Sequence, residues 1–214
     1  MSTSRLLIYN GALRACGERS LASLSEAREP RYLLDDVWND GGVRACLEMA
    51  QWKFAMRAAE FTYESSVTPS WGYQYAFSKP TDWVNTSAVC SDEFFNNPLE
   101  QYSDEIQYWF ADITPLYIKY VSDAITYGNN LANWPVSFTR YVEAYFAANI
   151  VLKLTNGEKR WGAVQRVLKS TKLTAMNKDA MAGPTTKPAT GNWVRARGGG
   201  RRRDGGFTSG DLTE

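Results

Sequence analysis

The sequence of 214 residues contains no histidine, and this absence excludes several kinds of active site at once. Catalytic triads built on histidine, histidine-ligated metal sites and imidazole acid–base catalysis all need that side chain. Cysteine is scarce too: Cys16, Cys46 and Cys90 are too few and too scattered for a disulfide framework or a zinc site. We expect these three thiols to be small buried side chains in a reducing compartment.

Motifs and targeting segments are also lacking. The sequence has no glycine-rich phosphate loop, no CxxC pair and no nucleophile elbow. No apolar run approaches the roughly 20 residues of a membrane span, and the N-terminal region lacks the apolar core and cleavage site of a signal peptide. We therefore expect no enzyme activity, no cofactor, no metal and no membrane partner, and we expect assembly in a cytoplasm.

Aromatic residues are abundant and charge is unevenly distributed. Eight Trp and twelve Tyr can serve either a core or subunit interfaces. The net charge is only +1, but residues 92–112 carry six acidic side chains and no Lys or Arg. Paired carboxylates can hydrolyse glycosides or hold magnesium, although a solvated face is more common. The six are Asp92, Glu93, Glu100, Asp104, Glu105 and Asp112.

Apolar residues at helical spacing predict helices on both sides of the middle of the chain. The predicted helices cover residues 4–17, 28–52, a stretch beginning at Asn133, and 158–181. Gly41 and Gly42 fall inside the second of them, where we expect a bend or a close helix contact.

The middle of the chain, residues 57–122, shows alternating patterns instead. Alternation predicts strands over 57–63, 73–77, 108–113 and 116–122. We predict a short helix over residues 80–90. The predicted fold class is mainly α, a helical bundle over residues 1–182 with a small antiparallel β insertion over 57–122.

From Gly183 onward the composition changes to Gly, Pro and Arg, which predicts a flexible arm over residues 183–214. Trp193 and Phe207 are apolar residues within it that suit ordering on a partner. Its guanidinium groups can pair with phosphates or with protein carboxylates, so a nucleic-acid-binding protein acting through this tail is an alternative function. The arginines are Arg195, Arg197, Arg201, Arg202 and Arg203.

Short motifs recur in a definite order along residues 4–175. The first sixty residues contain YNGAL at 9–13, SLSE at 23–26, REPR at 28–31, LDDVW at 34–38 and WKFAMR at 52–57. They are followed by YAFSKPTDW at 75–83 and FTRYVEAY at 138–145. In this order and spacing the motifs resemble the tail tubular protein A, or head-to-tail adaptor, family of short-tailed bacteriophages.

The resemblance implies a structural virion protein at the head–tail junction. Such adaptors form a homo-oligomeric ring, twelvefold in the family, between the portal protein and the tail nozzle protein. The ring encloses the channel through which genomic DNA leaves, helps to retain packaged DNA, and is a platform for the nozzle and the tail fibres.

The resemblance also suggests roles for three groups of residues. The arm would bind the portal, with Trp193 and Phe207 as anchors and its arginines paired with portal carboxylates. The six acidic residues of 92–112 would line the channel and repel DNA phosphates, or else form an outward solvated face. Trp71, Tyr73 and Tyr75 would contact a neighbouring subunit or the nozzle, or else cap their own helical bundle.

Overall fold

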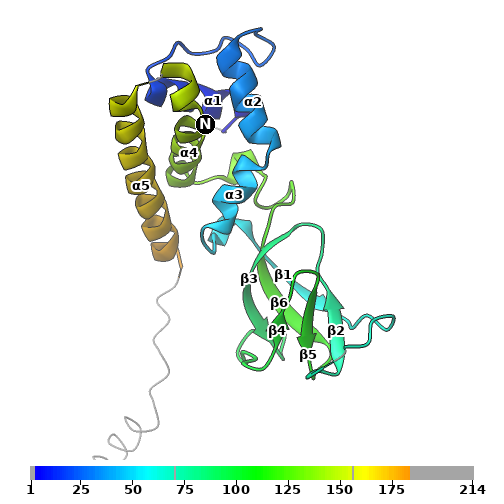
Figure 1. Ribbon diagram of the computed structural model, residues 1–214. Helices are drawn as coiled ribbons and strands as arrows, with labels where there is room; N and C mark the ends of the chain where they lie inside the picture. Colours follow the sequence, from blue (N-terminus) through cyan, green and yellow to red (C-terminus); the bar gives the residue numbers. More distant parts are fainter. Residues whose placement is uncertain (1–2, 70, 156, 184–214) are drawn as a thin grey trace, which may run out of the picture. The chain divides into compact units, whose positions relative to one another are not determined.

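The structure is a computed structural model that describes residues 3–69, 71–155 and 157–183. These residues form five α-helices, with 45% of the described residues helical, and two three-stranded antiparallel sheets, with 18% of them in strands (Figure 1). The fold is therefore α+β, and the prediction of a mainly α protein is wrong. The error arose because the predicted insertion forms two complete sheets with a core of their own.

The first predicted helix is confirmed as α1 (Arg5–Cys16). The Ser4 hydroxyl accepts a hydrogen bond from the Leu7 N–H at 3.3 Å, which satisfies one of the free donors of the first turn. Gly17 has φ 72°, a left-handed conformation that favours glycine, and it ends the helix. Local sequence signals alone are enough to set both ends of this element.

The predicted helix over 28–52 is interrupted. It consists of α2 (Glu29–Asn39) and α3 (Gly42–Glu48), separated at Gly41, which has φ 82°. A Cβ atom on Gly42 would lie 2.6 Å from the Val37 carbonyl oxygen and 3.3 Å from the Phe146 ring. The expected close helix contact is therefore present at Gly42, and the glycine pair also permits a sharp turn at Gly41 that breaks the helix instead of bending it.

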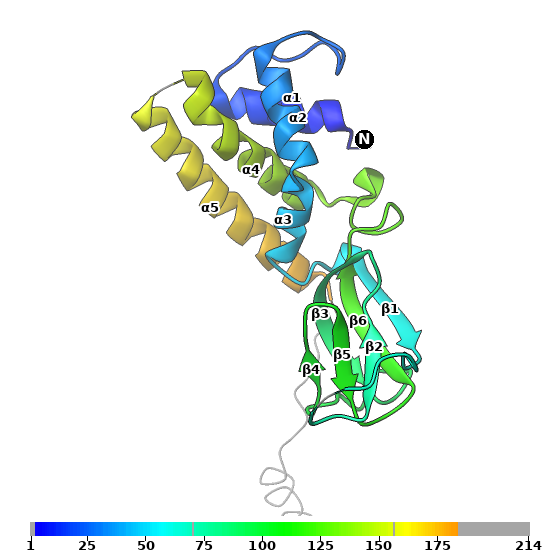
Figure 2. The same cartoon turned by 45° about the vertical axis from the view of Figure 1, so that its right-hand side comes forward.

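The last two predicted helices are confirmed as α4 (Val136–Thr155) and α5 (Glu158–Met181). α4 packs against α1, α2, α3 and α5 and is the central element of the helical part (Figure 2). Its buried residues lie all around its circumference, as expected for a helix covered on several sides. Two short 3₁₀ turns, η1 (Lys53–Ala55) and η2 (Leu131–Asn133), lie where the chain enters and leaves the strands.

The strands pair into two sheets. In the first, β6 (Leu116–Ser122) lies between β1 (Met56–Phe61) and β3 (Trp83–Cys90). In the second, β5 (Tyr108–Ala111) lies between β2 (Tyr75–Ser78) and β4 (Ser103–Asp104). The four predicted strands are confirmed as β1, β2, β5 and β6.

The predicted short helix over residues 80–90 is wrong, because this segment is strand β3. Its register against β6 shifts twice, between Trp83 and Asn85 and between Thr86 and Ala88. Each β-bulge adds a residue and breaks the two-residue alternation of buried and exposed side chains. The sequence pattern therefore lost the period that marks a strand.

Two hydrophobic cores hold the fold. The larger joins the helices and includes Tyr9, Trp52, Phe138 and Phe146. The smaller lies between the two sheets and is built around Trp109. Much of the aromatic content therefore serves the interior, and the remaining aromatic residues are available at the surface.

Candidate functional site

Asp35 joins three of the motifs that carry the family resemblance. Its carboxylate accepts hydrogen bonds from the Tyr9 hydroxyl at 2.8 Å and from the Arg5 guanidinium at 2.7 Å. The other carboxylate oxygen accepts from Arg31 at 2.5 Å, one helical turn earlier on α2. Burial raises the pKa of Tyr9, so its hydroxyl stays a hydrogen-bond donor at neutral pH. This network fixes α2 to α1.

The loop between α1 and α2 is held by side chains of the YNGAL and SLSE motifs. Asn10 accepts a hydrogen bond from the Leu21 N–H at 2.7 Å and donates to the Leu21 carbonyl at 3.1 Å. Glu26, the last residue of the SLSE motif, accepts from the Ala22 N–H at 2.8 Å. These polar motif residues therefore satisfy backbone groups that the loop would otherwise leave unpaired.

The aromatic motifs of η1 and α4 pack on each other. The ring centroid of Phe138 lies 4.9 Å from that of Trp52 and 4.7 Å from that of Phe54. The Trp52 indole N–H donates to the Cys46 carbonyl at 3.0 Å, so this buried polar atom is satisfied. The WKFAMR and FTRYVEAY motifs, far apart in sequence, thus share one part of the core.

Arg57 and Asp82 form an ion pair that links elements of the first sheet, as the Asp35 network links α1 and α2. The Arg57 guanidinium donates to the Asp82 carboxylate at 2.9 Å, and the Ser122 hydroxyl donates to the same oxygen. Burial raises the pKa of Asp82, but the hydrogen bonds from Ser122 and Arg57 outweigh it, so the pKa lies below the ordinary value of 3.8. One ion pair therefore ties β1, the turn before β3 and the end of β6 together.

Replacing Asp82 with asparagine should lower the free energy of unfolding at pH 7 by about 1–2 kcal/mol, because charge-assisted hydrogen bonds are lost. The folded-state pKa is depressed, so the carboxylate stabilises the fold above the ordinary pKa of 3.8, and this contribution is lost as the pH falls below it. Urea unfolding at pH 7 and pH 3 checks this. The difference between wild type and Asp82→Asn should shrink at pH 3, and a difference that is equal at both pH values would contradict the assignment.

The acidic residues of 92–112 lie at both ends of the sheets. Asp104 binds Lys79 close to the start of β3, and Glu105 follows Asp104 at the end of β4. Asp92 follows the end of β3, and Asp112 follows the end of β5 that is opposite to the Asp104 pairing. The eight residues of β3 span about 23 Å at roughly 3.3 Å per residue, so the structure does not bring the six carboxylates into one cluster. Their role as a channel lining stays a prediction.

Two of these carboxylates accept hydrogen bonds from backbone N–H groups. Asp92 accepts hydrogen bonds from the N–H groups of Asn96 at 3.0 Å and Asn97 at 2.8 Å, which lowers its pKa. Asp112 accepts from the Gln74 N–H at 2.9 Å. Glu93 and Glu100 are exposed. Within residues 3–69, 71–155 and 157–183, no group of three Cys, Asp or Glu side chains is placed to hold a metal ion.

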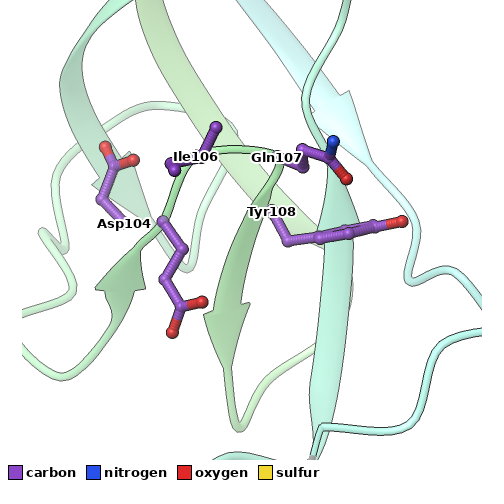
Figure 3. A pocket seen from close by; sticks show the side chains of 5 residues that line it. Asp104, Ile106, Gln107 and Tyr108 are labelled. Carbon is purple, nitrogen blue, oxygen red and sulfur yellow. The ribbon is translucent and has the colours of Figure 1, made fainter.

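The turn between β4 and β5 borders an open cavity of about 550 Å³ (Figure 3). Asp104 and Tyr108 lie on the two sides of the turn, and Ile106 at the tip of the turn is 91% exposed. The cavity is lined by two carboxylates, an amide, a phenol and one apolar side chain. This set can make polar and apolar contacts with a protein surface.

Lys79 is a site residue that the sequence analysis missed. Its ammonium group is bonded to Asp104 and lies 3.6 Å from the ring centroid of Trp83 and 5.4 Å from that of Trp109. It therefore anchors the β4–β5 turn to the core of the sheets. The signal in the sequence was its place in the YAFSKPTDW motif, four residues before Trp83.

The three aromatic residues proposed for subunit contacts differ in their surroundings. Trp71 is 89% exposed on the loop between β1 and β2. Tyr73 is half-buried, and Tyr75 packs against the core between the sheets, with its ring centroid 5.0 Å from that of Tyr63. Trp71 is therefore the member of the group that is free to contact a partner.

Alanine at Trp71 should leave the free energy of unfolding within about 0.5 kcal/mol of wild type, because the side chain is exposed. Alanine at Tyr75 should lower it by about 1–3 kcal/mol through lost packing. Chemical denaturation separates the two effects, and analytical ultracentrifugation measures assembly. Assembly that is weakened by Trp71→Ala alone supports a subunit contact, whereas unchanged assembly assigns the exposed indole to another role.

The remaining predicted site lies outside the described residues. It comprises the two aromatic anchors and five arginines of the arm, Trp193, Arg195, Arg197, Arg201, Arg202, Arg203 and Phe207.

Comparison with models of known protein families finds no match, and no curated protein matches the sequence. In the described ranges, no helix combines the length and apolar character needed to cross a membrane.

Proposed function

We propose that this protein is a structural virion subunit, a head-to-tail adaptor whose copies form a ring between the portal and the tail nozzle. The ring encloses part of the DNA ejection channel. One observation carries the proposal: the residues of the family-like motifs meet in space. Asp35 binds Tyr9 and Arg31, and Asp82 binds Arg57.

These contacts give a physical reason for the motifs to occur together. Each motif is short, and alone it would be a common helix or turn sequence. Arg57 of the WKFAMR motif, however, forms an ion pair with Asp82 of the YAFSKPTDW motif, which lies 25 residues later in the sequence. Such a partner stabilises a partly buried charge, so the motifs belong to one folding unit. This supports a shared architecture with the adaptor family, and the adaptor function is inferred from it.

Three polar motif residues have structural partners within the chain, which also favours an assembly role. Asn10, Asp35 and Asp82 bind backbone groups or guanidinium ions of their own chain. Exposed apolar side chains remain at Trp71 and Ile106. Contacts with other virion proteins would use such surface residues.

The proposal is tested by mixing the purified protein with the portal protein of the same phage. Native mass spectrometry and negative-stain imaging should show a complex of fixed stoichiometry with a ring of adaptor subunits on the portal. Absence of any complex contradicts the proposal. Binding of duplex DNA by the free protein, with log affinity falling linearly against log salt, would instead favour nucleic-acid binding through the arginine-rich tail.

A further inference from the structure

A groove between α1, α4 and α5 carries an unusual combination of side chains. It has a volume of about 370 Å³. Ala15, Ala144 and Val167 supply apolar walls, and Arg14 and Arg140 supply two positive charges. Glu143 lies in the same groove.

Glu143 is a partly buried carboxylate without a partner. In the part of the chain that the structure describes, it makes no side-chain hydrogen bond and no ion pair within 4 Å. A Cβ atom at Gly11 would lie 2.1 Å from its carboxyl carbon, so the carboxyl occupies space that only glycine leaves open. Burial raises the pKa of Glu143, and the neighbouring Arg14 and Arg140 lower it less. An acceptor in this position favours a hydrogen-bond donor from outside the chain.

The two arginines of the groove are also free to bind. Arg14 and Arg140 are exposed and form no ion pair in the described ranges. A ligand that fits this groove therefore combines an apolar body, one hydrogen-bond donor and negative charges. A nucleic-acid phosphate fits poorly, because it has no donor for Glu143 and would be repelled by that carboxylate.

α2 presents a surface that combines an apolar ring, a hydrogen-bond donor and negative charges, as a ligand of this groove requires. Glu29, Tyr32 and Asp36 are spaced three and four residues apart, so they lie on one face of the helix. All three are exposed, Tyr32 by 50%. The guanidinium carbon of Arg31 lies 4.0 Å from the centroid of the Tyr32 ring and supports it. A tyrosine offers an apolar ring and one hydroxyl donor, and here it is flanked by two carboxylates.

We infer that the groove of one copy binds the Glu29–Tyr32–Asp36 surface of a second copy. The Tyr32 ring packs on Ala15 and Val167, and its hydroxyl donates to the Glu143 carboxylate. Glu29 and Asp36 face Arg14 and Arg140. This contact rests on the proposed function, which requires that copies of the chain assemble.

The two surfaces lie on different sides of the molecule. α2 and α5 flank α4 on opposite sides in both views (Figure 1, Figure 2). A contact between unlike surfaces of identical chains is heterologous, and it closes into a ring or continues as a filament. The proposed contact therefore has the symmetry that an adaptor ring needs.

Charge reversal provides the test. One variant, Glu29→Lys/Asp36→Lys, reverses the α2 surface, and the other, Arg14→Glu/Arg140→Glu, reverses the groove. Each variant alone should self-associate at least about tenfold more weakly than wild type, because like charges then face each other. An equimolar mixture should regain assembly, with the two variants alternating, because each reversed surface meets a complementary one. Sedimentation velocity and native mass spectrometry measure both effects.

Matched variants separate this contact from general effects. Tyr32→Ala should weaken assembly, whereas Phe94→Ala removes an exposed aromatic side chain outside the contact and should not. Lys119→Glu/Lys153→Glu makes the same charge change as the groove variant on exposed residues elsewhere and should also assemble normally. Circular dichroism melting confirms that each variant folds.

Several outcomes overturn the inference. They are a wild-type chain that stays monomeric at millimolar concentration and low salt, assembly that is insensitive to both reversals, and a mixture that does not recover. If rings still form on the portal with reversed variants, the proposed function stands and this contact is wrong. If wild type assembles through the groove but never binds the portal, the contact stands and the proposed function fails.

Discussion

Replacing Trp52 with alanine should lower the free energy of unfolding by about 3–5 kcal/mol, which is a large part of the stability of a typical domain. The side chain is 1% exposed and packs against Phe54, Phe138 and Tyr141. Its removal leaves a cavity in the larger core and also leaves the Cys46 carbonyl without its indole donor. Urea unfolding followed by circular dichroism measures the change.

Trp109 provides the matched variant in the smaller core, where it is 0% exposed and donates its indole N–H to Thr86 at 3.0 Å. Trp109→Ala should cost a similar 3–5 kcal/mol or so. Since the two tryptophans belong to separate clusters, the losses in a double variant should add within about 0.5 kcal/mol. A loss below 1 kcal/mol or so for either single variant would contradict the assignment of that tryptophan to a core.

The helices could be predicted from sequence because their signals are local. Ser4 and Gly17 mark the ends of α1, and apolar spacing marks α4 and α5. The break between α2 and α3 depends on how close Gly42 comes to Phe146, a contact across the fold. The low helix propensity of glycine predicts a free-energy cost for a helix at Gly41 and Gly42. It does not predict whether the helix bends there or ends in a turn.

The sheets were harder to predict because strand pairing is non-local. β1 pairs with β6 across more than fifty residues, and β3 joins the same sheet only through two bulges. A pattern of buried residues at 84, 89 and 90 is compatible with either a helix or a strand when the partner strand is unknown. Because β3 was not predicted as a strand, the two-sheet core and the α+β class were not predicted either.

The candidate site was predicted in its residue types but not in its arrangement. Motif spacing identified Asp35 and Asp82 as parts of a pattern, while their partners Arg5 and Ser122 came only from the fold. Six carboxylates close in sequence were separated because β-strands carry neighbouring residues to opposite ends of a sheet. Glu143 and Gly11 belong to the FTRYVEAY and YNGAL motifs, but only the fold shows that the Glu143 carboxyl occupies the space above Gly11.

Deleting residues 184–214 should weaken binding to the portal at least about a hundredfold. Tryptophan and arginine are the residue types that most often dominate binding at interfaces, and the arm contains Trp193 and five arginines within eleven residues, 193–203. The free energy of unfolding should stay within about 0.5 kcal/mol, because all of the described residues that form the two hydrophobic cores lie before the deletion. Surface plasmon resonance on immobilised portal and urea unfolding measure the two quantities.

Substitutions within the arm distinguish how the binding arises. Lysine at all five arginines keeps the charge but removes the bidentate guanidinium geometry. If the arm pairs with portal carboxylates, this variant should bind the portal about tenfold more weakly, since paired hydrogen bonds to each carboxylate are lost. If the arm binds DNA through charge alone, the lysine variant should keep both its affinity for DNA and its salt dependence. Truncated protein that docks on the portal as well as wild type would show that the contact lies within residues 1–183, and the surface to examine next would then be the exposed Trp71 and Ile106.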